Sequence, residues 1–438
     1  MKVKMKKTLI FIVLIFLYGS LNAQNLKIFT MEEAVAEAMK SNSDIITARL
    51  EQIKAKNKVS ETYNESLLPT LTLSTQYIRA FKKPVFDIFG QKYEIGTDNQ
   101  ITNTLSASEP IPFLGTPIFQ GIRIAEYYAA LQSENVSAVE TRVKSEVKKA
   151  FYNVLLLKEV VEINKKSLQN ALSNLEVVEK KYKAGTETEF NLLRARVKVE
   201  NIKPSLAQSE NNLSLAKKAL KNTIGIKSNE EIDVLGTLTY DSTEIIGNTD
   251  EILYKIAESN VAIRQLNISK KINEEVVKID NANYLPKLYL FGQYQLNASE
   301  NDGKYFFNYR YFNVVNAGIG LSWNLNFVSN SYKKQQSLVD VKKTEEIIID
   351  TKNKLKLAGQ GIIQTMEDAK NRIIANKENI RLAEKGYELA VTSFRNGVIT
   401  QIDVLDAELI LNQTRLAYVQ SIYDYLKAKV ELEQLLEK

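Results

Sequence analysis

The chain repeats the same arrangement twice, and each copy carries two strand-like segments between very long helical ones. The first copy reads YNESLLPTLTLSTQY around Pro69, and the second reads DNANYLPKLYLFGQY around Pro286, so both prolines would mark helix–strand junctions. Further on, YKAGTETEFNLLRA around Gly185 corresponds to FRNGVITQIDVLDA around Gly397. Both pairs lie about 215 residues apart, and similarity at a fixed interval is typical of a repeated structural unit. We therefore predict a tandem duplication.

The duplicated part follows a targeting segment. Residues 1–23 have the pattern of a secretory signal peptide, with four lysines before an apolar run and Ala23 before the cleavage point. Beyond it we expect a first structural repeat at 24–228, a linker or equatorial belt at 229–249, and a second repeat at 250–438. The whole chain has 58 Lys and Arg against 52 Asp and Glu, so removing the four lysines leaves a nearly neutral protein. This balance gives no indication of nucleic-acid binding.

The composition excludes many catalytic and metal sites, because the chain contains no cysteine and no histidine. Disulfides, thiolate or imidazole zinc sites, and the Ser-His and Cys-His catalytic pairs are therefore impossible. The sequence also has no glycine-rich phosphate loop and no dinucleotide-binding fingerprint. We expect no enzyme activity, no cofactor and no metal site.

Four segments have the alternation of membrane-embedded β-strands. In the clearest of them, every odd-numbered residue from Val315 to Phe327 is apolar, and the even-numbered residues between them are Asn, Ser or Gly. A soluble sheet packed on helices would alternate in the same way, but its outer face would usually carry charges, which are missing here. The expected strands are about 70–80, 101–111, 287–297 and 313–327.

Four strands per chain cannot form a closed barrel alone. After the signal peptide no helix is apolar enough to span a membrane, and a closed barrel is the other structure that can do so. The two unpaired edges would leave backbone groups without partners in hydrocarbon. Closure therefore requires a homo-oligomer surrounded by outer-membrane lipid, in which two copies give eight strands and three give twelve. The strand pattern leaves the number of copies open.

Two helical stretches are too long for a compact domain. Apolar residues three and four apart continue over 119–182 and 331–394, which at about 1.5 Å per residue corresponds to about 96 Å each. Shorter helices are expected before the strands, at about 31–66 and 250–283. Returning helices are expected after the turns, and Pro204 should kink or break the first of them.

The turns that end the long helices have recognisable local signals. Gly185 and Gly397 are placed to adopt the left-handed conformation that ends a helix. Thr188 and Thr400 are placed to cap the returning helices, expected at about 188–224 and 401–436.

Over essentially its whole mature length the chain resembles the TolC-like outer membrane efflux protein (OEP) family. The resemblance rests on the duplicated helix–strand–strand–helix order, the Leu-Pro junctions and the two turn motifs, of which F/Y-x-x-G followed by DVLDA is the most specific. It implies a mainly α fold with membrane β-structure, in which a homotrimer forms a 12-stranded β-barrel continuous with an α-helical coiled-coil barrel in the periplasm. It also implies an outer-membrane channel-tunnel that serves as the exit duct of a tripartite efflux pump or type I secretion system. The implied partners are a periplasmic adaptor (membrane fusion) protein and an inner-membrane pump or transporter.

The family resemblance also implies a role for two acidic residues. Asp403 and Asp406 match the acids that line the periplasmic entrance, and three copies would place six carboxylates at one pore mouth. Asp403 has a second interpretation, because Thr400 three residues earlier completes a capping-box pattern and the helix dipole favours an acid there. The first repeat has Asn191 and Arg194 at the corresponding positions.

The polar tie that closes the entrance in some members of the family is missing from this sequence. The tyrosine and arginine that form it correspond to Phe394 and Ile399 here. We expect closure by other contacts, with Glu187 and Arg194 as candidates.

Two other functions fit parts of the sequence. A secreted coiled-coil structural or adaptor protein would have such helices, but it would be expected to carry charged residues along both strand faces, and these are nearly absent. A porin-like passive channel would have such strands, but it needs no long helices. The sequence does not identify the exported substrate, since the pump would select it.

Overall fold

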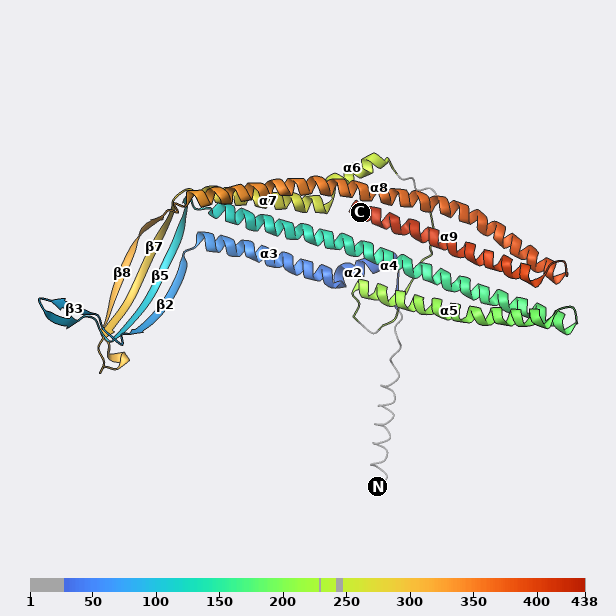
Figure 1. The fold of residues 1–438 in the computed structure, drawn as a ribbon, viewed down its shortest axis with the longest axis horizontal. Helices are drawn as coiled ribbons and strands as arrows, with labels where there is room; N and C mark the ends of the chain where they lie inside the picture. Colours follow the sequence, from blue (N-terminus) through green and yellow to red (C-terminus); the bar gives the residue numbers. More distant parts are fainter. Residues whose placement is uncertain (1–26, 228–229, 242–246, 438) are drawn as a thin grey trace, which may run out of the picture. The chain divides into compact units, whose positions relative to one another are not determined.

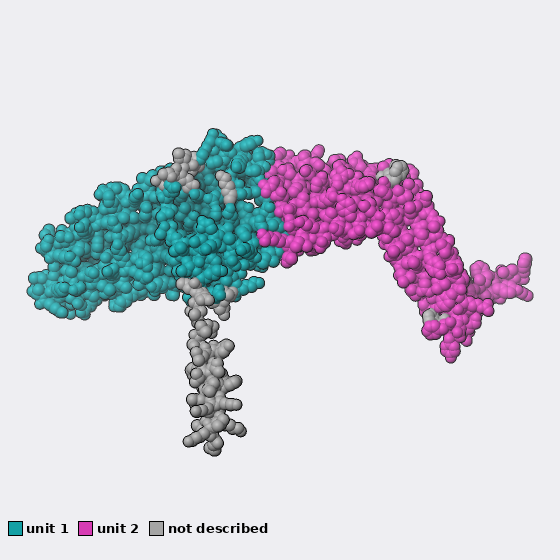
Figure 2. Space-filling view, turned by 180° about the vertical axis from the view of Figure 1, so that it is seen from behind, with its two compact units in different colours: residues 1–48, 136–261, 352–438 teal, residues 49–135, 262–351 magenta. Residues whose placement is uncertain are grey.

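The computed structural model describes residues 27–227, 230–241 and 247–437, so the expected signal peptide lies outside the described residues. The chain folds into two compact units, which are coloured separately in Figure 2. Each unit is built from segments of both halves of the chain. The first comprises residues 1–48, 136–261 and 352–438, and the second comprises residues 49–135 and 262–351.

The second unit contains a four-stranded antiparallel sheet in the order β2-β5-β7-β8 (Figure 1). Each strand lies where the sequence pattern predicts one, and the two halves of the chain meet where β5 pairs with β7. Strands β2 and β8 form the edges of this sheet. The bounds are β2 Thr70–Arg79, β5 Asn99–Leu114, β7 Lys287–Glu300 and β8 Tyr311–Ser322.

The prediction that the last strand extends to Phe327 is wrong. Strand β8 ends at Ser322, and Phe327 is already the first residue of the next helix. Between them, Trp323 Nε1 donates to the backbone oxygen of Tyr284 over 3.1 Å, and Asn324 Oδ1 accepts from the backbone nitrogen of Asn326 over 3.0 Å. The alternation thus continues through a turn that is held by one hydrogen bond to a residue 39 positions away and by one local hydrogen bond. Alternation alone cannot distinguish such a turn from a strand.

The register places the predicted apolar residues of all four strands on one face of the sheet. Leu73 pairs with Leu105, and Leu290 pairs with Ile319, while their sequence neighbours pair on the opposite face. The apolar face is exposed in the protomer, since the exposed fractions of Leu73, Val315 and Ile319 are 72%, 71% and 70%. Small polar residues dominate the other face, including Thr72, Ser74, Thr104, Ser106, Gln293 and Asn316. An exposed apolar face of this extent needs a cover, which lipid would provide.

A short hairpin between β2 and β5 was not predicted. Strands β3 (Val85–Ile88) and β4 (Gln91–Glu94) pair around a turn in which Phe89 has φ +56° and Gly90 has φ +83°. The Asp87 carboxylate accepts from the backbone nitrogen of Gly90 over 2.9 Å. The two-residue turn with glycine is a usable signal, but strands of four residues are too short to recognise by alternation. A single 3₁₀ turn, η1 (Phe306–Asn308), lies between β7 and β8.

Two very long helices run through both units. Helix α4 (Ile118–Lys183) has 66 residues and α8 (Phe327–Arg395) has 69. In the second unit they accompany α3 (Ser43–Leu67) and α7 (Val261–Ala282). Among the described residues, no helix contains an 18-residue stretch that is both apolar and poor enough in charge to be a candidate membrane span.

The first unit packs the remaining helices around the largest apolar core. These helices are α2 (Met31–Ser41), α5 (Glu189–Ile224), α6 (Thr249–Ser259) and α9 (Gln401–Leu435). Two three-residue strands that were not predicted, β1 (Lys27–Phe29) and β6 (Ile232–Val234), pair in parallel beside them. The core includes Val143, Val147, Phe151, Val154, Leu220, Ile224, Ile256 and Tyr425.

The helices expected at 31–66 and 250–283 are each interrupted at the same relative position, and new helices enter there, at the corresponding KSNSDI and ESNVAI segments. Asn42 and Asn260 have extended backbones there, with φ/ψ of −67°/129° and −62°/140°. Asn42 Nδ2 donates to the backbone oxygen of Thr223 over 2.8 Å, and Asn260 Nδ2 donates to that of Leu435 over 3.0 Å. Each asparagine thus binds the end of the returning helix of its own repeat.

Pro204 does not break α5, which runs from Glu189 to Ile224 without interruption. The glycine that ends this helix, Gly225, has φ +91°, and a Cβ atom added there would lie 2.4 Å from the backbone oxygen of Ser41. Only glycine fits both the backbone angle and this close approach.

We predict that the apolar face of the sheet contacts lipid. Replacing Ile319 by Arg should cost about 2–4 kcal/mol near the bilayer midplane. Asn316→Arg, on the opposite face of the same strand, is the matched control and should be tolerated. The yield of assembled protein in outer-membrane fractions measures the difference, and equal yields would contradict a lipid-facing assignment.

Candidate functional site at the two helix turns

The two predicted turns have the same backbone hydrogen bonds. Gly185 N donates to Tyr182 O over 3.0 Å, and Thr186 N donates to Lys181 O over 2.9 Å. In the second turn Gly397 N donates to Phe394 O over 3.1 Å, and Val398 N donates to Ser393 O, five residues earlier, over 2.9 Å. The φ angles of Gly185 and Gly397 are +73° and +77°. This is the left-handed glycine termination that the sequence predicts.

The threonines after the glycines begin the returning helices in two different ways. Thr188 Oγ1 accepts from the backbone nitrogen of Asn191 over 3.2 Å, as an N-cap does. In the second turn the Asp403 carboxylate accepts from Thr400 N over 2.8 Å and from Thr400 Oγ1 over 2.6 Å. These two hydrogen bonds lower the pKa of the Asp403 carboxyl, so Asp403 performs the capping role expected of it.

Asp406 has no such local role. Its side chain is exposed one helical turn after Asp403, and the structure gives it no hydrogen bond or ion pair within the described part of the chain. Residues three apart share a helix face, so both carboxylates of α9 point away from the same side of that helix. The pair therefore presents two exposed negative charges at the second turn.

The four helices meet at the turns in a small apolar cluster. Its buried members are Val178 of α4, Leu192 and Ala195 of α5, Phe394 of α8 and Val404 of α9. Ile399 packs against this cluster from the turn itself. Phe394 and Ile399, which stand where some members of the family have the tyrosine and arginine of the polar tie, are therefore used for apolar packing.

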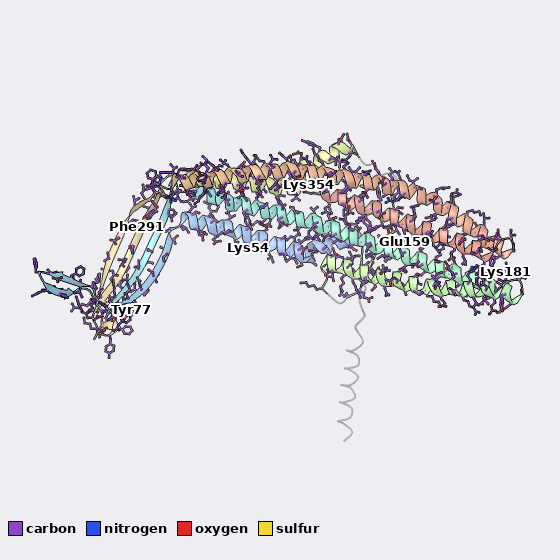
Figure 3. All side chains as sticks on the ribbon, in the orientation of Figure 1. Lys54, Tyr77, Glu159, Lys181, Phe291 and Lys354 are labelled. Carbon is purple, nitrogen blue, oxygen red and sulfur yellow. The ribbon has the colours of Figure 1, made fainter. Side chains whose placement is uncertain are left out.

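Lys181 connects the two turns directly. Its Nζ lies 4.2 Å from the centre of the Phe394 ring and donates to the backbone oxygen of the same residue. Figure 3 labels Lys181 near the end of α4, beside the turns. A cation over an aromatic face that also donates to one of the last carbonyls of a helix stabilises that contact in two ways. Sequence reasoning missed this residue, because its partner lies 213 positions away.

Glu187 and Arg194, the two residues expected to help close the entrance, have their partners inside the first turn. The Glu187 carboxylate accepts from the side-chain amide of Asn191. The Arg194 guanidinium lies 4.6 Å from the centre of the Phe190 ring. Within this protomer neither residue serves as the tie between the turns.

A buried acid lies behind the exposed pair. Glu408 of α9 is only 2% exposed; its carboxylate accepts from Ser167 Oγ of α4 over 3.2 Å and lies 3.9 Å from Lys198 Nζ of α5. Burial raises the pKa of the Glu408 carboxyl, against the opposing influence of Lys198 and Ser167. Burial, together with the charge of Glu408, also raises the pKa of Tyr387 on α8 to about 12.

A signal for this acid exists in the sequence. Val404, Glu408 and Leu411 are spaced as one buried face of a helix, and all three are buried. At the start of the same helix, Gln401 is 1% exposed, and its side-chain amide has no hydrogen-bond partner in the described structure. Buried polar groups thus accumulate in the part of α9 nearest the turn.

No group of three or more acidic residues in the described ranges is arranged to hold a metal ion. The turns present exposed carboxylates over an apolar cluster, with the buried Glu408 farther along α9.

Comparisons with known proteins agree with the fold. A family model described as outer membrane efflux protein matches residues 34–226 and 252–437. The outer membrane protein TolC of Vibrio cholerae is 21% identical over 317 residues, which cover 71% of this chain and 71% of that protein. The cobalt-zinc-cadmium resistance protein CzcC of Cupriavidus metallidurans is 21% identical over 339 residues, which cover 76% of this chain and 77% of that one.

Solved structures give the same result. The CmeC outer membrane channel of Campylobacter jejuni superposes with a TM-score of 0.76 at 17% identity, covering 93% of this chain and 85% of that one. At this level of identity the likeness establishes a shared fold.

We predict that Glu408 makes the folded protein less stable as the pH rises. Folding raises the pKa of the Glu408 carboxyl. The contribution of Glu408 to the free energy of unfolding is therefore most favourable below the ordinary pKa of a glutamate, and it is lost as the pH rises through the raised pKa. Glu408→Gln should therefore raise the thermal midpoint at about pH 8 and have little effect at about pH 4. Circular dichroism of the helices measures this, with the exposed Glu388→Gln as control. An effect of Glu408→Gln that is the same at both pH values would contradict the prediction.

Proposed function

Because the outer membrane efflux protein model matches most of its length, the chain belongs to that family, and we propose that three copies form one exit duct of an export system. The protein resides in the outer membrane, with its helical part in the periplasm, and acts in efflux. What the proposal adds is the assembly: a 12-stranded barrel closed by three sheets and continuous with a tunnel of helices.

The unpaired edges of the sheet are the observation that carries the proposal. Within the described protomer β2 and β8 each have a neighbour on one side only, while one face of the sheet is apolar and exposed. In hydrocarbon every unpaired backbone group costs several kcal/mol. Pairing β8 of one copy with β2 of the next removes both edges, and three copies of four strands give an even-numbered barrel in the usual range.

The partners proposed are a periplasmic adaptor protein and an inner-membrane pump or transporter. The turns carry exposed apolar side chains beside their charges, since Phe190, Val398 and Ile402 are 66%, 75% and 48% exposed. Such a surface suits contact with another protein. Neither an enzyme nor a passive porin explains two helices of 66 and 69 residues that end in these turns.

We further propose that Asp403 and Asp406 form the narrow entrance of the duct. The support is their position at the second turn, their exposure and, for Asp406, the lack of a local role among the described residues. Three-fold symmetry would gather six carboxylates into one ring, which attracts cations.

The assembly predicts a specific mass. Native mass spectrometry of the detergent-extracted complex should give three times the mass of the chain after signal-peptide removal. A monomer, or a protein found only in the soluble periplasmic fraction, would contradict the duct.

The entrance ring predicts a specific electrical response. Wild-type channels in a planar bilayer should be blocked by a trivalent cation such as hexaamminecobalt(III), and block should weaken as salt screens the ring. Asp403→Ala/Asp406→Ala should weaken the block by at least about tenfold, since several unit charges are removed. Glu388→Ala, an exposed acid on α8, is the control. If all three proteins are blocked equally, the ring is elsewhere and Asp403 is only a helix cap.

A further inference from the structure

We propose that Tyr289 and Phe291 of β7 form a binding platform for flat aromatic anions on the polar face of the sheet. The inference rests on the proposed function, because this face becomes the inner wall of the duct only when the barrel closes. It adds a binding site and a class of ligand to a wall whose residues nearest the two rings are small.

The two rings have only small neighbours across the strands. In this part of the sheet their cross-strand neighbours on β5 are Pro110 and Ser108, and those on β8 are Gly320 and Gly318. Farther along, the same face continues with Gln293, Ser106, Thr72 and Asn316. Phe312 and Val314 also lie on this face, but at its other end, so at the end near the helices two large rings among small neighbours need an explanation.

The glycines of β8 make room for the rings. A Cβ atom added to Gly320 would lie 2.2 Å from Tyr289 Cζ, and one added to Gly318 would lie 3.0 Å from Phe291 Cζ. Both rings therefore lean across β8 and occupy the space that side chains would fill there. Their centres are 6.1 Å apart and their planes are inclined by 43°. Figure 3 labels Phe291 on the sheet.

The platform is open to a ligand. Tyr289 and Phe291 are 37% and 38% exposed, so part of each ring is accessible. In a closed barrel the strand beyond β8 would be β2 of the next copy, whose residues on this face near the helices are Thr70 and Thr72. Side chains of this size leave the rings uncovered.

The charge beside the rings selects the ligand. Lys287 lies two residues before Tyr289, on the same face and opposite Ser322, and it is exposed. Among the described residues it forms no ion pair. The nearest acid on β5, Glu109, pairs with Leu290 and therefore lies on the opposite face. Two rings beside a free ammonium group suit an aromatic ring that carries a carboxylate or sulfonate.

A purely structural role is the competing explanation, because an aromatic ring over a glycine also stabilises neighbouring strands. Such a role predicts that replacing the rings changes assembly and leaves ligand binding unchanged. A platform predicts that replacing the rings reduces ligand binding and leaves assembly unchanged. Displacing one ring without removing it should then also reduce the affinity for the ligand.

The test is a calorimetric titration of naphthalene-2-sulfonate into the intact complex in a nonionic detergent. Phe291→Ser should weaken binding on the order of fivefold, the usual worth of one aromatic contact. Tyr294→Ser, on the opposite face of the same strand, should leave it unchanged. Cyclohexanesulfonate, with the same charge and no aromatic ring, should bind more weakly than the naphthalene compound.

Two further variants keep the test decisive if Phe291→Ser does not assemble. Gly320→Ala should displace the Tyr289 ring and weaken binding, whereas Gly292→Ala, which meets no atom within 4 Å, should not. Lys287→Gln should weaken the binding of naphthalene-2-sulfonate and leave the binding of the uncharged naphthalene-2-methanol unchanged. Equal affinities for wild type, Gly320→Ala and Lys287→Gln would overturn the platform.

The mass of the same samples separates the two proposals. A wild-type trimer that does not bind the probe overturns the platform and leaves the duct intact. A wild-type protein that is not a closed oligomer has no inner wall, and that result overturns both.

Discussion

The outer strands of the sheet, β2 and β8, each present a row of backbone N–H and C=O groups that no other described strand of the protomer pairs with. In water such edges can be solvated, but one face of this sheet is apolar, and a lipid surrounding offers those groups no partner. The rest of the molecule is consistent with this constraint. Each repeat contributes two adjacent strands, and β5 and β7 join the repeats at the centre, so the free edges come from opposite ends of the duplication. The proposed assembly would pair these two edges between copies.

The duplication preserved the backbone more strictly than the side chains. Gly185 and Gly397 share a left-handed conformation, and Asn42 and Asn260 share an extended one, because in each case the chain must turn or break at that point. The residues after the turns are less constrained. Thr188 caps its helix through its own hydroxyl, whereas Thr400 is bound by Asp403, so one geometry is reached with different chemistry. Asp406 has no backbone role, and Arg194 stands in its place in the first repeat. The proposed charged entrance therefore uses residues of the second repeat only.

Features with local signals could be predicted from the sequence, and features that depend on distant partners could not. Alternation located the strands, and glycine followed by threonine located the turns, since these patterns reflect the backbone within a few residues. The end of β8 was missed because Trp323 leaves the strand to bond Tyr284, which lies 39 residues away. The bonds from Asn42 and Asn260 to Thr223 and Leu435 were missed for the same reason, although Asn42 also has a local role, because its side-chain oxygen accepts from the backbone nitrogen of Asp44. At the turns, the capping role of Asp403 was foreseen, but the contact of Lys181 with Phe394 was not, because nothing near either residue indicates the other.

The acids near the second turn respond to pH in opposite directions. Hydrogen bonds from Thr400 lower the pKa of Asp403, so it keeps its charge until the pH falls below the ordinary value for an aspartate. Burial raises the pKa of Glu408, so it takes up a proton earlier on acidification. A falling pH therefore first relieves the unfavourable buried charge among α4, α5 and α9, while the exposed charge at the turn persists. The groups facing Glu408 do not reverse this order, because Ser167 and Asn412 are uncharged, Arg415 is paired with Glu384, and Lys198 is partly exposed. The packing beneath the turn and the charge on its surface are thus controlled by different groups over different pH ranges.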